Sequence, residues 1–167
     1  RMNEQVVTFG QAGALVGMVH LPPPDLQRAD TPGIVLLNAG MVHRVGPNRI
    51  YVKLARELAA RGHVVLRFDF SGFGDSGVRR DHLPMEKCMV DETSEAMSVL
   101  STRFGCTSFI LMGLCSGATA AHKTATVNPR VVGAVLINMR AGGDELRSYI
   151  MGRSALRKYS RVLTRPS

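Results

Sequence analysis

The feature that most constrains the fold is an alternation of short, mostly apolar runs with helical patterns. The apolar runs lie at residues 33–38, 63–70, 108–113 and 131–139, and the segments between them repeat apolar residues every three to four positions. Such runs are typical of strands that are buried on both faces of a parallel sheet, and parallel strands need crossover connections. Residues 5–9 and 15–21, joined by a turn at 11–13, predict a hairpin. The sequence therefore predicts an α/β fold: a mostly parallel sheet of about six strands covered by helices on both faces.

Helices are expected at residues 47–61, 84–100, 116–126 and 144–163. In the first, Ile50, Leu54 and Leu58 share one face, while Pro47 suits the first turn and Gly62 a left-handed stop. A chain of 167 residues, 45% of them apolar, has enough surface to bury for one core. We therefore expect one domain at residues 1–142, followed by a basic C-terminal helix at residues 143–167.

The net charge of +8 is concentrated at the C-terminal end, where six Lys and Arg residues and no acidic residue follow position 146. We interpret this run as a solvated helix face, with a phosphate-binding surface as the alternative, because no nucleic-acid-binding motif accompanies it and aromatic residues make up only 5% of the chain. No apolar run reaches the about 18 residues that a membrane helix needs, and no secretory signal pattern is visible. Three cysteines fit neither a disulfide framework nor a metal site. These features predict a cytoplasmic protein with no metal, no nucleic acid and no membrane span.

Residues 72–77 match the G-x-G-x-x-G pattern of dinucleotide sites and follow a predicted strand. In a dinucleotide site, however, the third glycine opens a helix and an acidic residue ends the next strand. Here residues 78–84 separate the last glycine from the helix, and the nearest acidic residues fall inside that helix. We therefore interpret the segment as a tight turn whose glycines take positive φ, with nucleotide binding as the alternative, and expect no cofactor.

A second glycine motif, G-L-C-S-G at residues 113–117, joins a predicted strand directly to a helix. It matches the G-x-nucleophile-x-G turn, in which the residues two before and two after the nucleophile pack together and must be small. If Ser116 were the nucleophile, Leu114 would occupy one of those positions, and Leu is too large. The motif therefore favours Cys115, at a helix N-terminus that favours the thiolate form, with the Ser116 N–H aimed at the oxyanion.

Taken in order, these motifs resemble the alpha/beta-hydrolase superfamily. Residues 38–49 stand where these enzymes carry the oxyanion loop after the third strand. Residues 67–76 resemble their D-x-x-G-x-G-x-S turn after the fourth strand, and residues 113–117 resemble the turn after the fifth. The likeness is greatest to the serine-aminopeptidase-like group and, within it, to hydrolases associated with exosortase systems. A cysteine in place of the usual serine is a departure from the family pattern.

The resemblance implies acyl transfer from an ester or thioester to water, with a small-molecule acyl substrate. Cys115 would be the nucleophile, and the backbone N–H groups of Met41 and Ser116 would hold the oxyanion. Pocket candidates are Gly40, His43 and His82. His43 is either a base beside the nucleophile or, as we favour, a loop residue that shapes the oxyanion hole.

The resemblance also implies an acid after the sixth or seventh strand and a histidine base after the eighth. Only 52 residues follow Cys115, and they supply one strand and one long helix, so the core lacks the last two strands and neither group is identifiable. His122 lies about 10 Å further along its helix and cannot reach the thiol. Three accounts stay open: a partial sequence in which residues 144–163 begin a cap, a partner that supplies the missing strands, or a non-catalytic binding module. An unpaired edge on the sixth strand would favour self-association.

Overall fold

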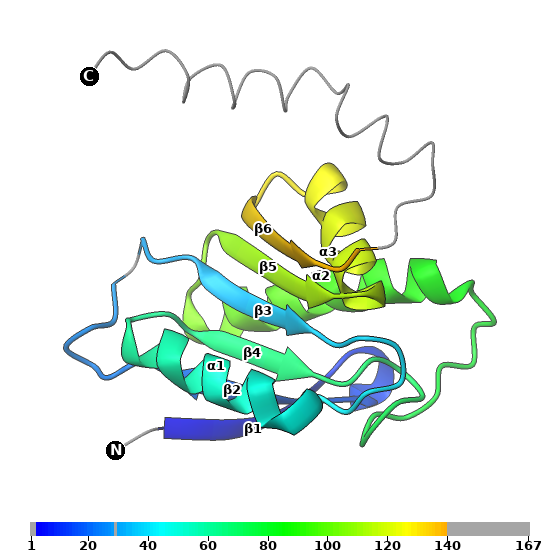
Figure 1. Ribbon diagram of the computed structural model, residues 1–167, viewed down its shortest axis with the longest axis horizontal. Helices are drawn as coiled ribbons and strands as arrows, with labels where there is room; N and C mark the ends of the chain where they lie inside the picture. The colour runs from blue at the N-terminus through cyan, green and yellow to red at the C-terminus, as the bar shows by residue number, and fades with distance from the viewer. Residues whose placement is uncertain (1–2, 29, 140–167) are drawn as a thin grey trace, which may run out of the picture.

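The computed structural model describes residues 3–28 and 30–139, which form a single six-stranded sheet in the order β1-β2-β4-β3-β5-β6 (Figure 1). The two strands of the N-terminal hairpin, β1 (Asn3–Phe9) and β2 (Leu15–Leu21), are antiparallel, and β2 runs antiparallel to β4. The other four strands are mutually parallel: β3 (Gly33–Leu37), β4 (Val65–Phe68), β5 (Phe109–Leu114) and β6 (Val131–Ile137). The predicted α/β class, strand count and hairpin are confirmed.

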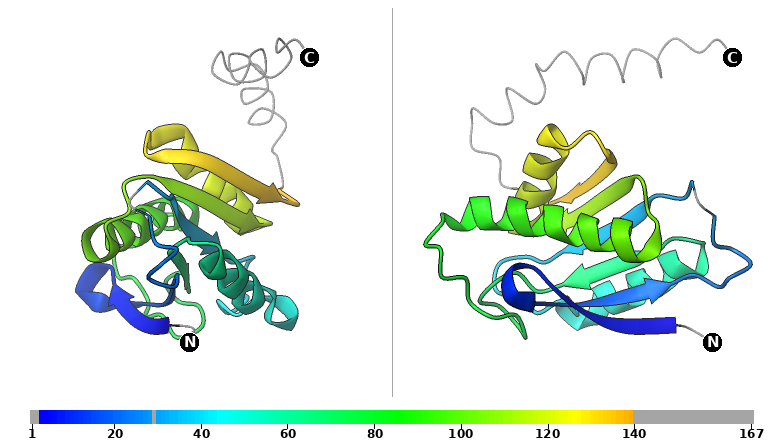
Figure 2. Two further views of the ribbon diagram at one scale, coloured as in Figure 1. Left: turned by 90° about the vertical axis from the view of Figure 1, so that its left-hand side faces the viewer. Right: turned by 180° about the vertical axis from the view of Figure 1, so that it is seen from behind.

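Helices cover both faces of the sheet, as predicted (Figure 2). On one face, α1 (Ile50–Ala60) buries Tyr51 and Ala55 against Ile34, Leu36 and Val65. On the other face, α2 (Met85–Phe104) and α3 (Ser116–Val127) pack on a larger apolar core that includes both hairpin strands. Because every residue of β3 is buried, this central strand is shielded from solvent on both sides.

The first helix begins later than the sequence predicted. Residues Pro47–Arg49 form a separate 3-10 turn, η2, in which Asn48 and Arg49 take φ of +49° and +58°. Left-handed backbone cannot continue into an α-helix, so α1 starts only at Ile50. Gly62, at φ +99°, follows the end of α1 in the left-handed conformation that the sequence indicated.

The last strand is more exposed than its apolar sequence indicated. The strand β6 pairs with β5 along one edge only, and Val132, Val135 and Ile137 are 51%, 45% and 41% exposed. The prediction of a buried strand is therefore wrong for the described residues, since α1 lies against β3 and β4 and does not extend over β6. The predicted boundary at residue 142 and the helix at 144–163 lie outside the described part of the chain. Within residues 3–28 and 30–139, none of the helices has the length and apolar character needed to cross a bilayer.

The register of the central strands decides which loops meet. The strand β3 pairs with β5 over its full length, from Gly33 opposite Phe109 to Leu37 opposite Gly113. Because the two strands are parallel and end together, the loop after β3 and the turn after β5 emerge side by side. Open parallel sheets bind ligands at this edge, so the loops that emerge there form the candidate site.

Candidate active site

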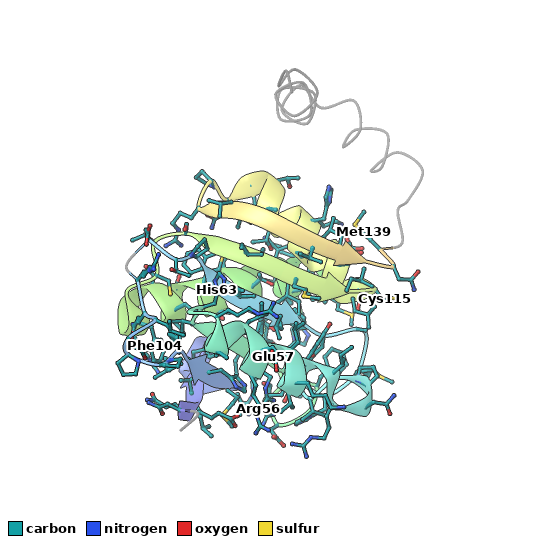
Figure 3. The ribbon with its side chains drawn as sticks, turned by 60° about the vertical axis from the view of Figure 1, so that its left-hand side comes forward. Arg56, Glu57, His63, Phe104, Cys115 and Met139 are labelled. Atoms are coloured by element: carbon teal, nitrogen blue, oxygen red, sulfur yellow. The ribbon has the colours of Figure 1, made fainter. Side chains whose placement is uncertain are left out.

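The connection between β5 and α3 consists of one residue, Cys115, in a strained conformation. Its φ is +54° and its ψ is −115°, which is rare for a residue with a side chain and costs about 1–3 kcal/mol. The Cys115 N–H donates to the Ile137 carbonyl at 2.9 Å, and the Cys115 carbonyl accepts the Ala118 N–H at 3.0 Å. Figure 3 shows Cys115 at the end of the sheet where β5 and β6 finish, opposite the end that carries His63 and Phe104. The thiol is half-buried.

Two glycines allow this turn to close. A Cβ atom on Gly113 would lie 2.2 Å from the carbonyl carbon and oxygen of Gly117. A Cβ atom on Gly117 would lie 2.3 Å from the Leu37 carbonyl oxygen at the end of β3. Both approaches are backbone contacts that no rotamer change can relieve. Gly113 is therefore a steric requirement of the turn itself, and Gly117 is a requirement of the close approach of α3 to the end of β3.

The loop after β3 lies directly against the start of α3. The Gly40 N–H donates to Ser116 Oγ at 2.6 Å, and the Val42 N–H donates to the Ala39 carbonyl at 3.0 Å. Gly40 takes φ +49° in this turn, a conformation that favours glycine. Met41, at the tip, is 81% exposed. The structure thus brings two of the predicted site residues, Gly40 and Ser116, into direct contact.

A buried carboxylate anchors the rest of this loop. Asp69 follows β4 and is fully buried. Its carboxylate accepts the Arg44 N–H at 2.6 Å, the Arg44 guanidinium and the Asn38 amide at 3.4 Å. The Arg44 guanidinium also contacts Asp75 at 2.7 Å, and this hydrogen bond is the main reason why the pKa of Asp75 lies below its usual range. Sequence reasoning did not assign Asp69 a role, although it is the first residue of the D-x-x-G-x-G-x-S pattern.

The same carboxylate shapes the glycine-rich turn after β4. A Cβ atom on Gly74 would lie 2.3 Å from the Asp69 carboxylate, and the Ser76 hydroxyl donates to the Asp69 carbonyl at 2.6 Å. From the other side, buried Glu92 of α2 accepts the Ser71 N–H at 2.9 Å. The segment is therefore packed against Asp69 and α2 and does not open a helix.

The predicted positive φ is confirmed for two of the three glycines of this turn. Gly72 and Gly74 take φ of +77° and +52°, but Gly77 is not left-handed. The Gly77 N–H instead donates to the Ala14 carbonyl at 2.8 Å and ties the turn to the N-terminal hairpin. Since α2 begins only at Met85, the helix N-terminus that a dinucleotide pyrophosphate requires is absent from this segment.

His43 points toward the charged cluster beside β4. Its Nε2 atom lies 3.4 Å from Asp75, 3.6 Å from Asp69 and 2.9 Å from the Arg44 guanidinium. One histidine and two carboxylates this close resemble a metal-ligand set, but the Arg44 guanidinium already lies among them and pairs with both acids. Within the described residues, no hydrogen bond joins His43 to Cys115. His82 is exposed between β4 and α2, and His122 lies on α3 as predicted.

Comparison with known proteins identifies the family to which the chain belongs. A family model described as serine aminopeptidase, S33, matches residues 29–164. No curated protein matches the chain. Among solved structures, an esterase from Pyrococcus furiosus has a TM-score of 0.66 at 14% identity, over 99% of this chain and 60% of that one. A hypothetical protein from Pseudomonas aeruginosa has a TM-score of 0.66 at 19% identity, over 99% and 56%.

An alpha/beta hydrolase from Penicillium is similar at 17% identity, with a TM-score of 0.64 over 99% of this chain and 56% of that one. The chain thus spans between 56% and 60% of the length of these three structures, and at such identities the likeness concerns the fold. The family match covers most of the chain and extends over the loop after β3, the turn after β4 and the Cys115 turn. The chain belongs to the serine aminopeptidase S33 family and has the alpha/beta-hydrolase fold.

Proposed function

We propose that this chain carries the nucleophile and the oxyanion donors of a hydrolase that acts on an ester or thioester. The observation that carries the proposal is the backbone of Cys115, at φ +54° and ψ −115° between β5 and α3, with Gly113 and Gly117 in backbone contact around it. A turn this tight lifts one side chain away from the sheet, as the nucleophile turn of this fold requires.

In the proposed reaction, Cys115 Sγ attacks the carbonyl carbon of the substrate and the carbonyl π electrons move to oxygen. The tetrahedral oxyanion collapses, expels the alcohol or thiol with the proton from sulfur, and leaves an acyl group on Cys115 as a thioester. Water then releases the carboxylic acid and restores the thiol. The reaction needs no cofactor.

The N–H groups of Ser116 and Met41 are the proposed oxyanion donors. The first turn of an α-helix leaves its N–H groups without intrahelical acceptors, and Ser116 is the first residue of α3. The loop that carries Met41 is bonded to α3 through Gly40 and Ser116. Gly40, His43 and His82 remain proposed pocket residues, and membership of the exosortase-associated group remains a prediction.

A burst assay with p-nitrophenyl acetate tests the proposal. We expect the wild-type chain to release p-nitrophenol in an initial burst that approaches one equivalent, and Cys115→Ala to lose it. Cys88→Ala is the matched control, because Cys88 is a half-buried thiol on α2 outside the proposed site. An undiminished burst in Cys115→Ala would mean that another group is acylated.

A non-catalytic binding module is the second candidate. It is favoured by the contacts of His43, whose ring is held by Arg44, Asp69 and Asp75 in a network that stabilises the loop. Iodoacetamide separates the two candidates, because a nucleophilic thiol is alkylated faster than free cysteine. A Cys115 thiol that reacts no faster than free cysteine would favour the binding module.

A further inference from the structure

The two halves of the loop after β3 are held in different ways. Arg44, in the second half, is anchored twice to the buried Asp69 carboxylate. The first half begins at Asn38, whose side-chain amide donates to the Phe68 carbonyl at 3.1 Å. In the four residues after it, from Ala39 to Val42, the hydrogen bond from Gly40 N–H to Ser116 Oγ is the one described hydrogen bond that reaches beyond the loop. Packing adds little, because Met41 is 81% exposed and a Cβ atom on Gly40 would meet nothing within 4 Å.

Ser116 therefore contacts the loop one residue before Met41, the other proposed oxyanion donor. Its own N–H begins α3 immediately after Cys115, while its hydroxyl oxygen accepts the N–H of the residue before Met41. One residue thus joins the helix N-terminus to the loop, over a sequence separation of 76 residues. This contact also shows that the hydroxyl is turned toward the loop after β3.

We infer that Ser116 is a positioning residue for the oxyanion site, and that its hydroxyl holds the loop that carries the Met41 N–H. By holding Gly40, it fixes the adjacent residue Met41 relative to the N-terminus of α3, where Ser116 supplies the other proposed oxyanion donor. The inference rests on the proposed function of Cys115 and adds a role for a side chain that the reaction itself does not consume. Because oxyanion stabilisation depends on donor placement, loss of the hydroxyl should slow only reactions that pass through an oxyanion.

Two reactions of the same thiol make this distinction measurable. Acylation of Cys115 by p-nitrophenyl acetate forms a tetrahedral oxyanion and expels p-nitrophenolate, while the thiol proton goes to solvent. Alkylation by iodoacetamide displaces iodide at a saturated carbon, again with loss of the thiol proton, and forms no oxyanion. The ratio of the two rates at Cys115 therefore reports on the oxyanion donors and not on the thiol.

In Ser116→Ala, we expect acylation to slow by roughly 2- to 12-fold, the range for loss of one hydrogen bond of typical net strength, with alkylation unchanged. Ser116→Thr retains the hydroxyl and should restore acylation. The control is Ser98→Ala on α2, which removes an exposed hydroxyl bonded to the Ser94 carbonyl at 3.0 Å and should leave both rates unchanged.

Three outcomes would overturn the inference. Equal slowing of both reactions in Ser116→Ala would indicate a disturbed thiol or turn, and unchanged or faster acylation would show that the hydroxyl does not position the donors. If the wild-type chain is not acylated at Cys115 at all, the proposed function fails and the inference fails with it. In that case the wild-type burst is missing, whereas failure of the inference alone leaves the burst intact and alters only the effect of the Ser116 substitutions.

Discussion

The close approach of β5 to α3 makes a strong prediction for Gly113→Ala. The added methyl group would lie 2.2 Å from the carbonyl carbon and oxygen of Gly117 and 2.4 Å from the Ala118 nitrogen, whereas real Cβ contacts lie beyond 3.0 Å. All three neighbours are backbone atoms, so relief requires the first turn of α3 to move outward by roughly 1 Å. That movement would also disturb the Gly117 contact with the end of β3.

Overpacking of a core by a methyl or methylene group costs typically 1–3 kcal/mol when side chains can adjust. Because here only backbone can move, we expect the upper end, a loss of about 3 kcal/mol in the free energy of unfolding. Urea unfolding followed by circular dichroism measures it, by linear extrapolation at a constant m value. The control is Gly133→Ala in β6, where the nearest atom to the new Cβ would be Ile110 Cγ1 at 3.5 Å, an ordinary contact. That variant should stay within about 0.5 kcal/mol of wild type.

If Gly113→Ala were as stable as Gly133→Ala, the tight turn around Cys115 would be wrong. The proposal for Cys115 would then lose its main structural support. If Gly113→Ala is destabilised but its Cys115 thiol reacts as in the wild type, the tight turn contributes to stability and is not needed to expose the thiol.

Two further predictions concern buried ionisable side chains, Asp69 and His20. Asp69→Asn should lower the free energy of unfolding by about 3 kcal/mol, because the Arg44 guanidinium loses its buried partner. The control, Glu86→Gln, removes one member of an exposed pair with Lys123 and should change the free energy little in the same urea assay. Equal effects of the two substitutions would contradict the anchoring role of Asp69. Burial, aided by the Arg67 charge, lowers the pKa of His20 from 6.5 to about 4, so protonation favours the unfolded chain. The contribution of His20 to the free energy of unfolding should therefore be level above pH 6.5 and be lost, by up to about 3 kcal/mol, between pH 6.5 and 4. His20→Gln should remove that part of the slope, and an unchanged slope would assign it to other groups.

Local patterns in the sequence were sufficient for most of the fold. The apolar run at residues 33–38 predicted a strand buried on both faces, and β3 is such a strand. For the similar run at 131–139 the prediction of a buried strand was wrong, because burial depends on the elements that cover a strand and not on the strand alone. The start of α1 was also misplaced, since Pro47 suits a helical first turn but the positive φ of Asn48 and Arg49 prevents one.

For the site, the spacing of small residues around Cys115 predicted a tight turn, because all of these residues lie within a few positions of one another. The anchoring role of Asp69 could not be predicted in this way. Its neighbours in space, Asn38 and Arg44, lie 31 and 25 residues away, and a carboxylate at the end of a strand is equally compatible with a solvent-exposed loop. Only its complete burial distinguishes an anchor from a surface acid.

The sequence by itself determined the order of strands and helices and the glycine-flanked strand-to-helix turn that contains Cys115, because hydrophobic periodicity and glycine spacing act within a few residues. Only the tertiary structure decided that Gly40 would bond to Ser116 and that Arg44 would lie against Asp69. These contacts depend on the parallel register that ends β3 beside β5 and on the burial of β4 between β2 and β3. Register and burial are properties of the whole sheet, so no segment of the chain specifies them alone.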